Sequence, residues 1–278
     1  MRVVITGAAG ALGTELVSAF ADHEVIAYKT LDVGDRDQVL QALAQTAPGV
    51  VVHAAAWTDV DGCELDPDRA FRANALGTRH VVAGALLVGA RVCYLSTDYV
   101  FDGEAGRPYT EWDTPNPLSV YGRSKLGGER ELGPEDTVVR TSWLAGSTGR
   151  NFVRTVVERA SAGKELAVVD DQHGCPTFTA DLAPMIRELV VARRAGVHHV
   201  TNQGVTSWYG LARETVEMAG MDPELVRPIT TAELDPPRPA PRPAFSVLDN
   251  AALRLAGLPL LDDYHAPLER LVKELVSK

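Results

Sequence analysis

Short apolar runs rich in β-branched residues alternate with segments of helical periodicity through the first half of the chain. The runs occupy residues 2–6, 24–28, 49–53, 91–96 and 137–140. Between them, apolar residues recur three or four positions apart, as in Leu12 and Leu16 or Val39 and Leu43. Repeated strand-helix-strand units build a parallel sheet, because the crossovers are right-handed and their helices cover both faces. We therefore expect an α/β fold with a doubly wound parallel sheet.

The second half of the chain is less regular. Its patterns predict helices over 151–162, 181–194, 207–218 and 266–276, and strands over 165–169 and 199–201. Residues 236–243, in which proline recurs, can form neither a helix nor a central strand and are expected to be an extended loop. These elements indicate a smaller C-terminal α/β unit beside the sheet.

Three glycines follow the first predicted strand and open the first predicted helix. They are Gly7, Gly10 and Gly13, in the spacing G-x-x-G-x-x-G. Glycine allows a tight turn and a close approach of the backbone, and the N–H groups at a helix N-terminus attract an anion. In this context the turn, which includes Ala11 and Leu12, predicts a dinucleotide pyrophosphate site. The alternative is a turn whose glycines only allow packing.

The end of the second predicted strand bears on the choice of cofactor. An acid there binds the adenosine ribose of NAD, whereas a base accommodates the phosphate of NADP. This strand has no acid at its end, and Lys29 is placed to meet a phosphate, unless it is a solvated surface lysine. The pattern favours NADPH, with NADH as the alternative, and Asp32 is expected near the adenine edge.

A second group of residues carries acid–base chemistry. Tyr121 and Lys125 are four residues apart and share one face of a helix. A free tyrosine has a pKa of about 10, which a neighbouring ammonium lowers. A Tyr-x-x-x-Lys pair also occurs by chance in helices, but here Thr97 and Asp98 end the fourth predicted strand, at the edge where such sheets bind ligands. Together these residues predict a nicotinamide-dependent oxidoreductase.

Composition narrows the classes of protein. The chain has 278 residues, a net charge of −10, 45% hydrophobic residues and no apolar run long enough to span a membrane. We expect a cytoplasmic protein with no secretory signal, no membrane contact and no nucleic-acid partner. The three cysteines have no metal-ligand spacing and no carboxylates cluster, so no metal site is expected.

Longer motifs resemble one family over nearly the whole chain. The segments are 52–61, 95–103, 117–129, 140–143, 151–152, 171–177 and 242–246, and the strings Ser-Thr-Asp-Tyr-Val-Phe and Asp-Gln-x-Gly-x-Pro-Thr are the most specific. The chain is similar to the extended short-chain dehydrogenases, and within them to the dTDP-4-dehydrorhamnose reductase family. The resemblance implies a Rossmann domain over residues 1–146, with 179–206 returning to it, and a substrate-binding domain formed by 147–178 and 207–278.

The resemblance also implies roles for individual residues. Tyr121 would protonate the C4 carbonyl oxygen, Thr97 would hold that oxygen, and Lys125 would hold the nicotinamide ribose and lower the tyrosine pKa. Further cofactor contacts are implied for the loop after the third strand, Ala54, Ala55 and Ala56. Substrate contacts are implied for Thr58, Val60, Thr97, Asp98, Tyr99, Trp143, Gln172 and Arg242.

Several of these positions also have a purely structural interpretation. Asn74 resembles an active-site asparagine but fits a capping or core role equally well, and Trp143 fits a sugar wall or the core. Arg242 suits a diphosphate or a solvated loop. Glu15 and Glu129 are expected on helix surfaces. His53 stands where the family has asparagine or histidine, and Cys175 where a small residue is usual.

The resemblance implies reduction of a nucleotide-linked 4-keto-6-deoxyhexose by NADPH, with dTDP-4-dehydro-β-L-rhamnose giving dTDP-β-L-rhamnose as the leading candidate. One alternative is a 4-ketoreductase for another dTDP-deoxysugar in antibiotic biosynthesis. Another is a non-catalytic NADP-binding protein like the regulatory subunit of methionine adenosyltransferase. An epimerase or dehydratase is less favoured, because dehydratases usually add acidic residues beside the threonine. The family suggests a homodimer.

Overall fold

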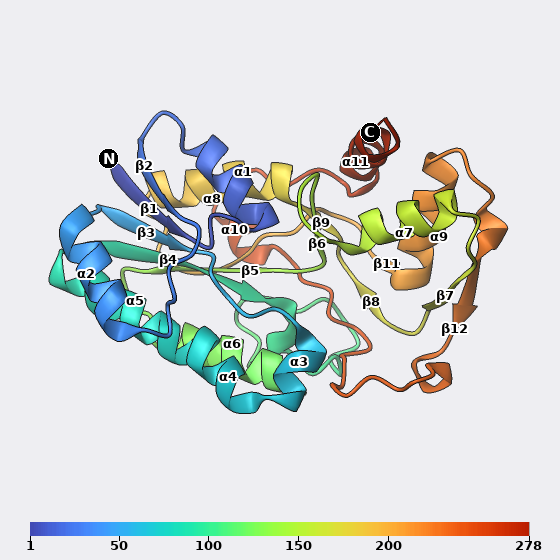
Figure 1. Ribbon diagram of the computed structural model, residues 1–278, viewed down its shortest axis with the longest axis horizontal. Helices are drawn as coiled ribbons and strands as arrows, with labels where there is room; N and C mark the ends of the chain where they lie inside the picture. Colours follow the sequence, from blue (N-terminus) through green and yellow to red (C-terminus); the bar gives the residue numbers. More distant parts are fainter. Residues whose placement is uncertain (278) are drawn as a thin grey trace.

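A six-stranded parallel sheet forms the larger lobe of the protein. The computed structural model describes residues 1–277. The strands lie in the order β10-β5-β4-β3-β1-β2 and all neighbours are parallel (Figure 1). Their bounds are β1 Arg2–Thr6, β2 Glu24–Tyr28, β3 Val50–His53, β4 Arg91–Thr97, β5 Thr137–Thr141 and β10 Gly196–His199. The strand order reverses between β1 and β3, and a crevice for ligands forms at such a point, outside the carboxyl ends of the strands.

Helices cover both faces of the sheet, as the alternation of side chains along β1 requires. Val3 and Ile5 join a core with α1 (Ala11–Ala19) and α8 (Thr179–Val191). Val4 points to the other face and packs with α2 (Arg36–Thr46) and α5 (Gly77–Leu87). On this second face α6 (Val120–Glu129) contacts β4 (Figure 1). The expected doubly wound α/β fold is confirmed.

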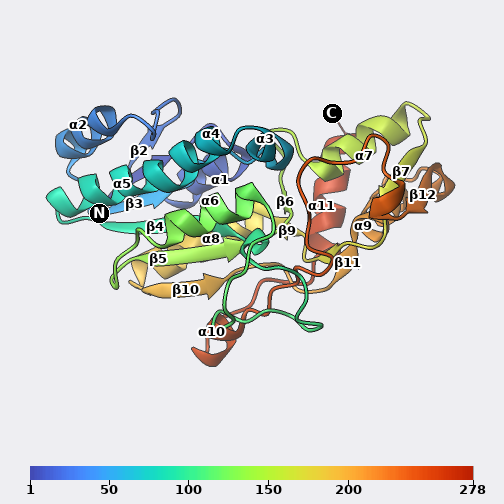
Figure 2. The same cartoon turned by 90° about the horizontal axis from the view of Figure 1, so that it is seen from below.

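The segment between β3 and α5 is almost continuously helical. It consists of α3 (Val60–Leu65), α4 (Pro67–Phe71) and a π-helical turn (Arg72–Leu76) that leads directly into α5. Asp59 and Asp66 cap the two short helices through their side chains. This segment lies over α6 and the end of β3 (Figure 2).

The smaller lobe lies beyond the carboxyl ends of the strands (Figure 1). Its helices α7 (Phe152–Ser161), α9 (Trp208–Met218) and α11 (His265–Val276) pack around Phe152, Leu211 and Leu268. The strand pairs are β6 (Leu144–Ala145) with β9 (Thr177–Phe178), β8 (His173–Gly174) with β11 (Thr206–Ser207), and β7 (Leu166–Val169) with β12 (Val226–Ile229). Short 3₁₀ turns occur at Asp98–Val100, Pro223–Leu225 and Thr231–Glu233. Residues 236–243 form no helix or strand, as predicted.

The strands and helices predicted by residue range exist, and two of them have bounds that differ from the prediction by two residues or more. The strand predicted over 199–201 is β10, Gly196–His199, because pairing with β5 sets its register. The helix predicted over 181–194 is α8, Thr179–Val191, and Arg193 just beyond it has a left-handed backbone with a φ of 54°. The sequence did not predict the short helix α10 (Ala251–Leu255), which packs on β10 and places Leu253 in the core of the larger lobe (Figure 2).

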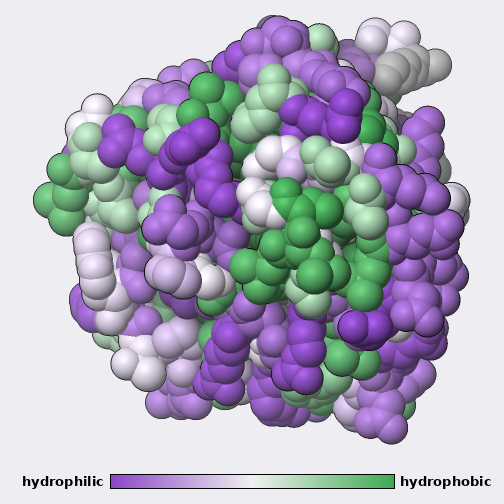
Figure 3. Space-filling view, turned by 90° about the vertical axis from the view of Figure 1, so that its left-hand side faces the viewer, coloured by the Kyte–Doolittle hydropathy of each residue, from purple (hydrophilic) through white to green (hydrophobic). Residues whose placement is uncertain are grey.

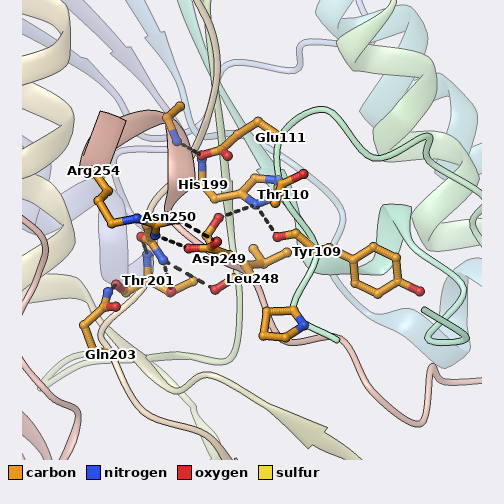
Figure 4. Close-up of polar contacts among 12 residues, drawn as sticks. Tyr109, Thr110, Glu111, His199, Thr201, Gln203, Leu248, Asp249, Asn250 and Arg254 are labelled. Atoms are coloured by element: carbon orange, nitrogen blue, oxygen red, sulfur yellow. Dashed lines mark hydrogen bonds and ion pairs between the residues drawn. The ribbon is translucent and has the colours of Figure 1, made fainter. Parts of the chain in front are cut away.

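A polar network fastens α10 and the strand end to the sheet (Figure 4). Glu111 Oε1 accepts hydrogen bonds from the backbone N–H groups of His199, at 2.9 Å, and Ala252, at 3.1 Å. The side chain of Asn250 accepts from Thr201 N at 2.8 Å. These side chains satisfy the backbone N–H groups of His199 and Thr201 on the side of the strand away from β5, while Val200 N still donates to Arg140 O of β5 at 2.9 Å.

An apolar surface lies at the end of the molecule opposite the smaller lobe. Figure 3 looks onto this end and shows hydrophobic residues gathered among hydrophilic ones. Leu86 and Leu87, at the end of α5, are about three-quarters exposed, 73% and 75%. This surface is at the amino ends of the strands, away from the crevice.

Candidate active site

A cavity of about 670 Å³ lies at the carboxyl edge of the sheet, between the two lobes. This volume is in the range of small-molecule and cofactor sites. The lining residues are Gly7, Ala9, Gly10, Ala11, Leu12, Gly13, Lys29, Leu31, Ala54, Ala55, Ala56, Thr58, Val60, Leu95, Ser96, Thr97, Asp98, Tyr99, Tyr121, Lys125, Thr141, Ser142, Trp143, Leu144, Arg150, Asn151 and Trp208. One cavity therefore contains both groups of motif residues that the sequence separates by more than a hundred positions.

The three glycines of the turn after β1 have different tasks. Gly7 has a φ of 68°, and a Cβ there would lie 2.6 Å from Ala55 N. A Cβ on Gly13 would lie 2.2 Å from Gly7 O, so both positions require glycine for packing. Gly10 is less crowded, with Gly7 O 3.4 Å from a Cβ, and it is the N-cap of α1 without a side chain to fill the helix end. The first turn of α1 carries no acidic residue, which leaves the helix N-terminus suited to a phosphate.

Of the two residues predicted near the adenosine, one lines the cavity and the other does not. Lys29, just after β2, lines the cavity. Asp32 lies outside the lining, where its carboxylate accepts from Gly34 N at 2.9 Å and pairs with Arg72 at 3.1 Å. Asp32 thus shapes the loop after β2.

The predicted acid–base residues converge in the cavity. Thr97 ends β4, and Tyr121 and Lys125 lie one turn apart on α6, which begins where the Ser119 side chain caps Gly122 N. A Cβ on Gly122 would lie 2.1 Å from Tyr99 O, so glycine permits the approach of α6 to this loop. Lys125 Nζ donates to Leu95 O at 2.6 Å and lies 4.2 Å from the centre of the Tyr94 ring.

The electrostatics of Tyr121 differ from the sequence expectation. Burial raises the pKa of Tyr121 above its ordinary value, and the hydrogen bond with Thr97 opposes that rise. The ammonium of Lys125 donates a hydrogen bond to the Leu95 carbonyl. Burial lowers the pKa of Lys125 itself to about 7, opposed by the charge of Glu129. A raised pKa keeps Tyr121 protonated at neutral pH, the state that a proton donor requires.

A buried carboxyl group lies behind Thr97. Thr97 Oγ1 donates to Asp98 Oδ1 at 3.0 Å, and Ser246 Oγ donates to Asp98 Oδ2. Burial raises the pKa of Asp98 to about 6, against these hydrogen bonds. Although Asp98 lines the cavity, its two oxygens are bonded to Thr97 and Ser246. The carboxyl group of Asp98 therefore orients the threonine hydroxyl.

The predicted substrate residues divide into two sets. Thr58, Val60, Tyr99 and Trp143 line the cavity. Gln172 and Arg242 do not, because Gln172 Nε2 donates to Thr231 at 2.9 Å and Arg242 forms an ion pair with Asp61 at 2.6 Å. Asn74 is also outside the lining: its side-chain amide bonds both the N and O of Trp57, and Ser124.

An aromatic pair forms part of the wall on the side of the smaller lobe. Trp143 stacks on Trp208 with ring centres 3.6 Å apart and planes within 7°. Trp143 has a φ of 47°, which is unusual for a bulky residue, and a Cβ on Gly174 would clash with its ring at 2.5 Å. Trp208 and Arg150 also line the cavity, and neither was predicted because no sequence motif contains them.

Glu129 corrects another expectation. Its side chain is only 6% exposed and lies inside the protein rather than on the helix surface. It forms a bidentate pair with buried Arg140, at 2.9 and 2.7 Å, and accepts from Ser96. Within residues 1–277, no three His, Cys, Asp or Glu side chains gather in a way that could hold a metal ion.

Comparison with known proteins gives concordant matches. The family model described as the RmlD substrate-binding domain matches residues 1–277. A probable dTDP-4,6-dihydroxy-2-methyloxan-3-one 4-ketoreductase of Streptomyces antibioticus is 44% identical, covering 100% of this chain and 96% of that protein. A dTDP-4-dehydrorhamnose reductase of Streptomyces griseus is 43% identical over 96% of this chain and 91% of that protein.

A solved structure supports the same relationship. It is the dTDP-4-dehydrorhamnose reductase of Bacillus anthracis in complex with NADP, which is 37% identical. The two folds superpose with a TM-score of 0.93, covering 98% of this chain and 99% of that one.

Proposed function

Since the chain belongs to the family of the RmlD substrate-binding domain, we propose that it reduces the C4 ketone of dTDP-4-dehydro-β-L-rhamnose with NADPH. It is an oxidoreductase of the dTDP-4-dehydrorhamnose reductase type. The observation that carries the proposal is the presence of Thr97, Tyr121 and Lys125 in the same cavity as the glycine turn.

The residues of the cavity fit a nicotinamide dinucleotide. The turn at Gly10 offers the open helix N-terminus that a pyrophosphate needs, and Lys29 supplies a cation beyond β2. A related protein was crystallised with NADP, which supports the same cofactor here. When bound, the reduced nicotinamide supplies hydride to the substrate carbonyl carbon.

The chain's own residues handle the proton. As the carbonyl carbon receives hydride, its oxygen gains negative charge and requires a proton. The phenol of Tyr121 donates that proton, and the Thr97 hydroxyl holds the same oxygen after its proton turns from Asp98 Oδ1 to the substrate. Lys125, fixed on Leu95 O, holds the ribose beside the reacting ring.

The test uses purified protein with NADPH and enzymatically prepared dTDP-4-dehydro-β-L-rhamnose, with the product identified by NMR. We expect Tyr121→Phe to lower kcat about 10²- to 10⁴-fold, the usual contribution of a general acid, while leaving the Kd of NADPH unchanged. Near-normal turnover by this variant would remove Tyr121 as the proton donor. Absence of turnover by the wild type with this sugar would remove the proposed substrate.

A second candidate is a 4-ketoreductase acting on another dTDP-linked deoxysugar. The 44% identity to the Streptomyces antibioticus 4-ketoreductase favours it. Both reactions use the same proton donor, so the two candidates differ in the sugar-facing wall, where Val60, Trp143 and Trp208 lie. Turnover of several dTDP-4-ketosugars in parallel, compared by kcat/KM, distinguishes them. A purely regulatory NADP-binding protein is disfavoured by the complete set of acid–base residues.

We place this enzyme in the cytoplasm as a homodimer. The free thiols of Cys63, Cys93 and Cys175 agree with a reducing compartment. None of the helices in residues 1–277 combines the length and apolar character needed to cross a membrane. Light scattering at several concentrations tests the dimer, and a monomeric mass throughout would contradict it.

A further inference from the structure

A short loop from the smaller lobe reaches the glycine turn. Residues 146–151 connect β6 to α7. A Cβ on Gly149 would lie 3.6 Å from Ala11 Cβ and 3.9 Å from Ala11 N. Because Ala11 is the first residue of α1, the loop lies close to the helix end that is suited to a phosphate.

The loop is held in one shape by side chains of the next helix. Arg154 donates from Nε to Gly149 O at 3.1 Å and from Nη2 to Ser147 O at 2.6 Å. Asn151 caps α7 with its Oδ1 and donates from Nδ2 to Gly146 O at 2.8 Å. Gly149 has a φ of 72°, which glycine adopts without strain. The position of Arg150 is therefore fixed by structure on both sides.

Arg150 is one of three cationic side chains in the lining of the cavity. Lys125 is committed to Leu95 O, and Lys29 lies beyond β2. No ion pair of Arg150 is found within the described residues, and the side chain is exposed. The chain has a net charge of −10, yet Arg150 brings an unpaired positive charge to the cavity beside the glycine turn. Its guanidinium is therefore available for an anionic ligand.

We propose that Arg150 binds the pyrophosphate of the dinucleotide from the side of the smaller lobe. This inference rests on the proposed function only in taking a nicotinamide dinucleotide as the ligand. The guanidinium fork matches phosphate oxygens, and the closeness of the neighbouring Gly149 to Ala11 puts Arg150 at the pyrophosphate end of the site. Lys29, farther along the cavity at the end of β2, is left for the phosphate that distinguishes NADPH from NADH.

The experiment measures the affinities of the full-length protein for NADPH, NADH and dTDP, each alone, by titration calorimetry. Five proteins are compared: wild type, Arg150→Gln, Arg150→Lys, Lys29→Gln and Arg130→Gln. Arg130 is exposed, follows the last turn of α6 and is not in the cavity lining, so its replacement removes the same charge elsewhere. Thermal unfolding of each variant checks that the fold is retained.

We expect Arg150→Gln to weaken NADPH and NADH by the same factor, roughly tenfold, as the loss of a hydrogen bond to a charged group predicts. Lys29→Gln should weaken NADPH alone, and Arg130→Gln should change neither. Arg150→Lys should recover part of the affinity, since it restores the charge without the fork.

Several results would overturn the inference. An unchanged affinity of Arg150→Gln for both dinucleotides would exclude the contact, and a selective loss for NADPH would move Arg150 to the adenosine phosphate. A loss confined to dTDP would assign it to the substrate instead. Failure of the wild type to bind either dinucleotide is a separate outcome that would contradict the proposed function itself.

Discussion

At the scale of single residues, the pair formed by Glu129 and Arg140 is the most consequential charge interaction outside the cavity lining. Both side chains are almost fully enclosed, at 6% and 4% exposure, and Arg140 Nη1 has no hydrogen-bond partner. Glu129 lies one helical turn after Lys125, and Ser96, which donates to it, follows Leu95 in β4. The pair therefore ties the helix that carries the proposed proton donor, Tyr121, to the strands beneath it.

Removal of one partner leaves a buried charge uncompensated. We expect Glu129→Gln to lower the free energy of unfolding by about 3–5 kcal/mol, measured by urea denaturation. Glu131→Gln is the matched control, because Glu131 pairs with Arg79 at the surface, where such a pair contributes at most about 1 kcal/mol. Equal losses in the two variants would contradict the special role of the buried pair.

At the scale of elements, different glycines in the turn from β1 into α1 serve packing and ligand binding. Gly13→Ala places a methyl group against the Gly7 carbonyl, and we expect it to cost about 1–3 kcal/mol of stability through overpacking. Gly10→Ala meets nothing closer than 3.4 Å and should fold almost normally, but its methyl group stands at the helix end proposed to bind phosphate and should weaken the binding of NADPH. Chemical denaturation and NADPH titration of both variants test this separation.

Local patterns predicted the elements well wherever the signal lies within one segment. The glycine turn, the pair on α6 and the strand before Thr97 are each contiguous, and the structure places them in one cavity. The predicted bounds of β10 were wrong because its pairing with β5, which lies more than fifty residues earlier, sets the register from Gly196 to His199.

Pairing across the chain also explains the site residues that the sequence placed elsewhere. Arg242 is neutralised by Asp61, which lies 181 positions earlier, and Asp32 pairs with Arg72. Arg150 and Trp208 line the cavity because the smaller lobe packs beside it, and no sequence motif predicts their position. The charge on Glu129 suggested a surface position, since a partner such as Arg140 is not recognisable without the fold.

At the scale of the whole molecule, two buried histidines govern the response to acid. Burial lowers the pKa values of His53 and His199 to about 3, below the ordinary 6.5. The unfolded chain therefore binds more protons than the folded one, and stability falls as pH decreases from 6.5 toward 3. Asp98 acts in the opposite direction, because its pKa is raised from 3.8 to about 6, and its contribution grows as pH falls through 6.

Each fully engaged group contributes a slope of about 1.4 kcal/mol per pH unit. His53→Asn should therefore reduce the acid slope of the unfolding free energy by about that amount between roughly pH 6 and pH 4. Urea denaturation at several pH values measures this slope in both proteins. An unchanged slope would show that His53 is not a source of the acid sensitivity.

The return of α8, β10 and α10 to the sheet means that the polypeptide passes back and forth between the lobes. The smaller lobe is thus not a cassette that can be cut out and exchanged between relatives. A chimaera joined at a single point would sever the sixth strand from its sheet and expose Leu182, Ile186 and Leu253. Changing the sugar specificity therefore requires replacement of the loops around the cavity. The sheet and the helices α8 and α10 that return to it must be kept.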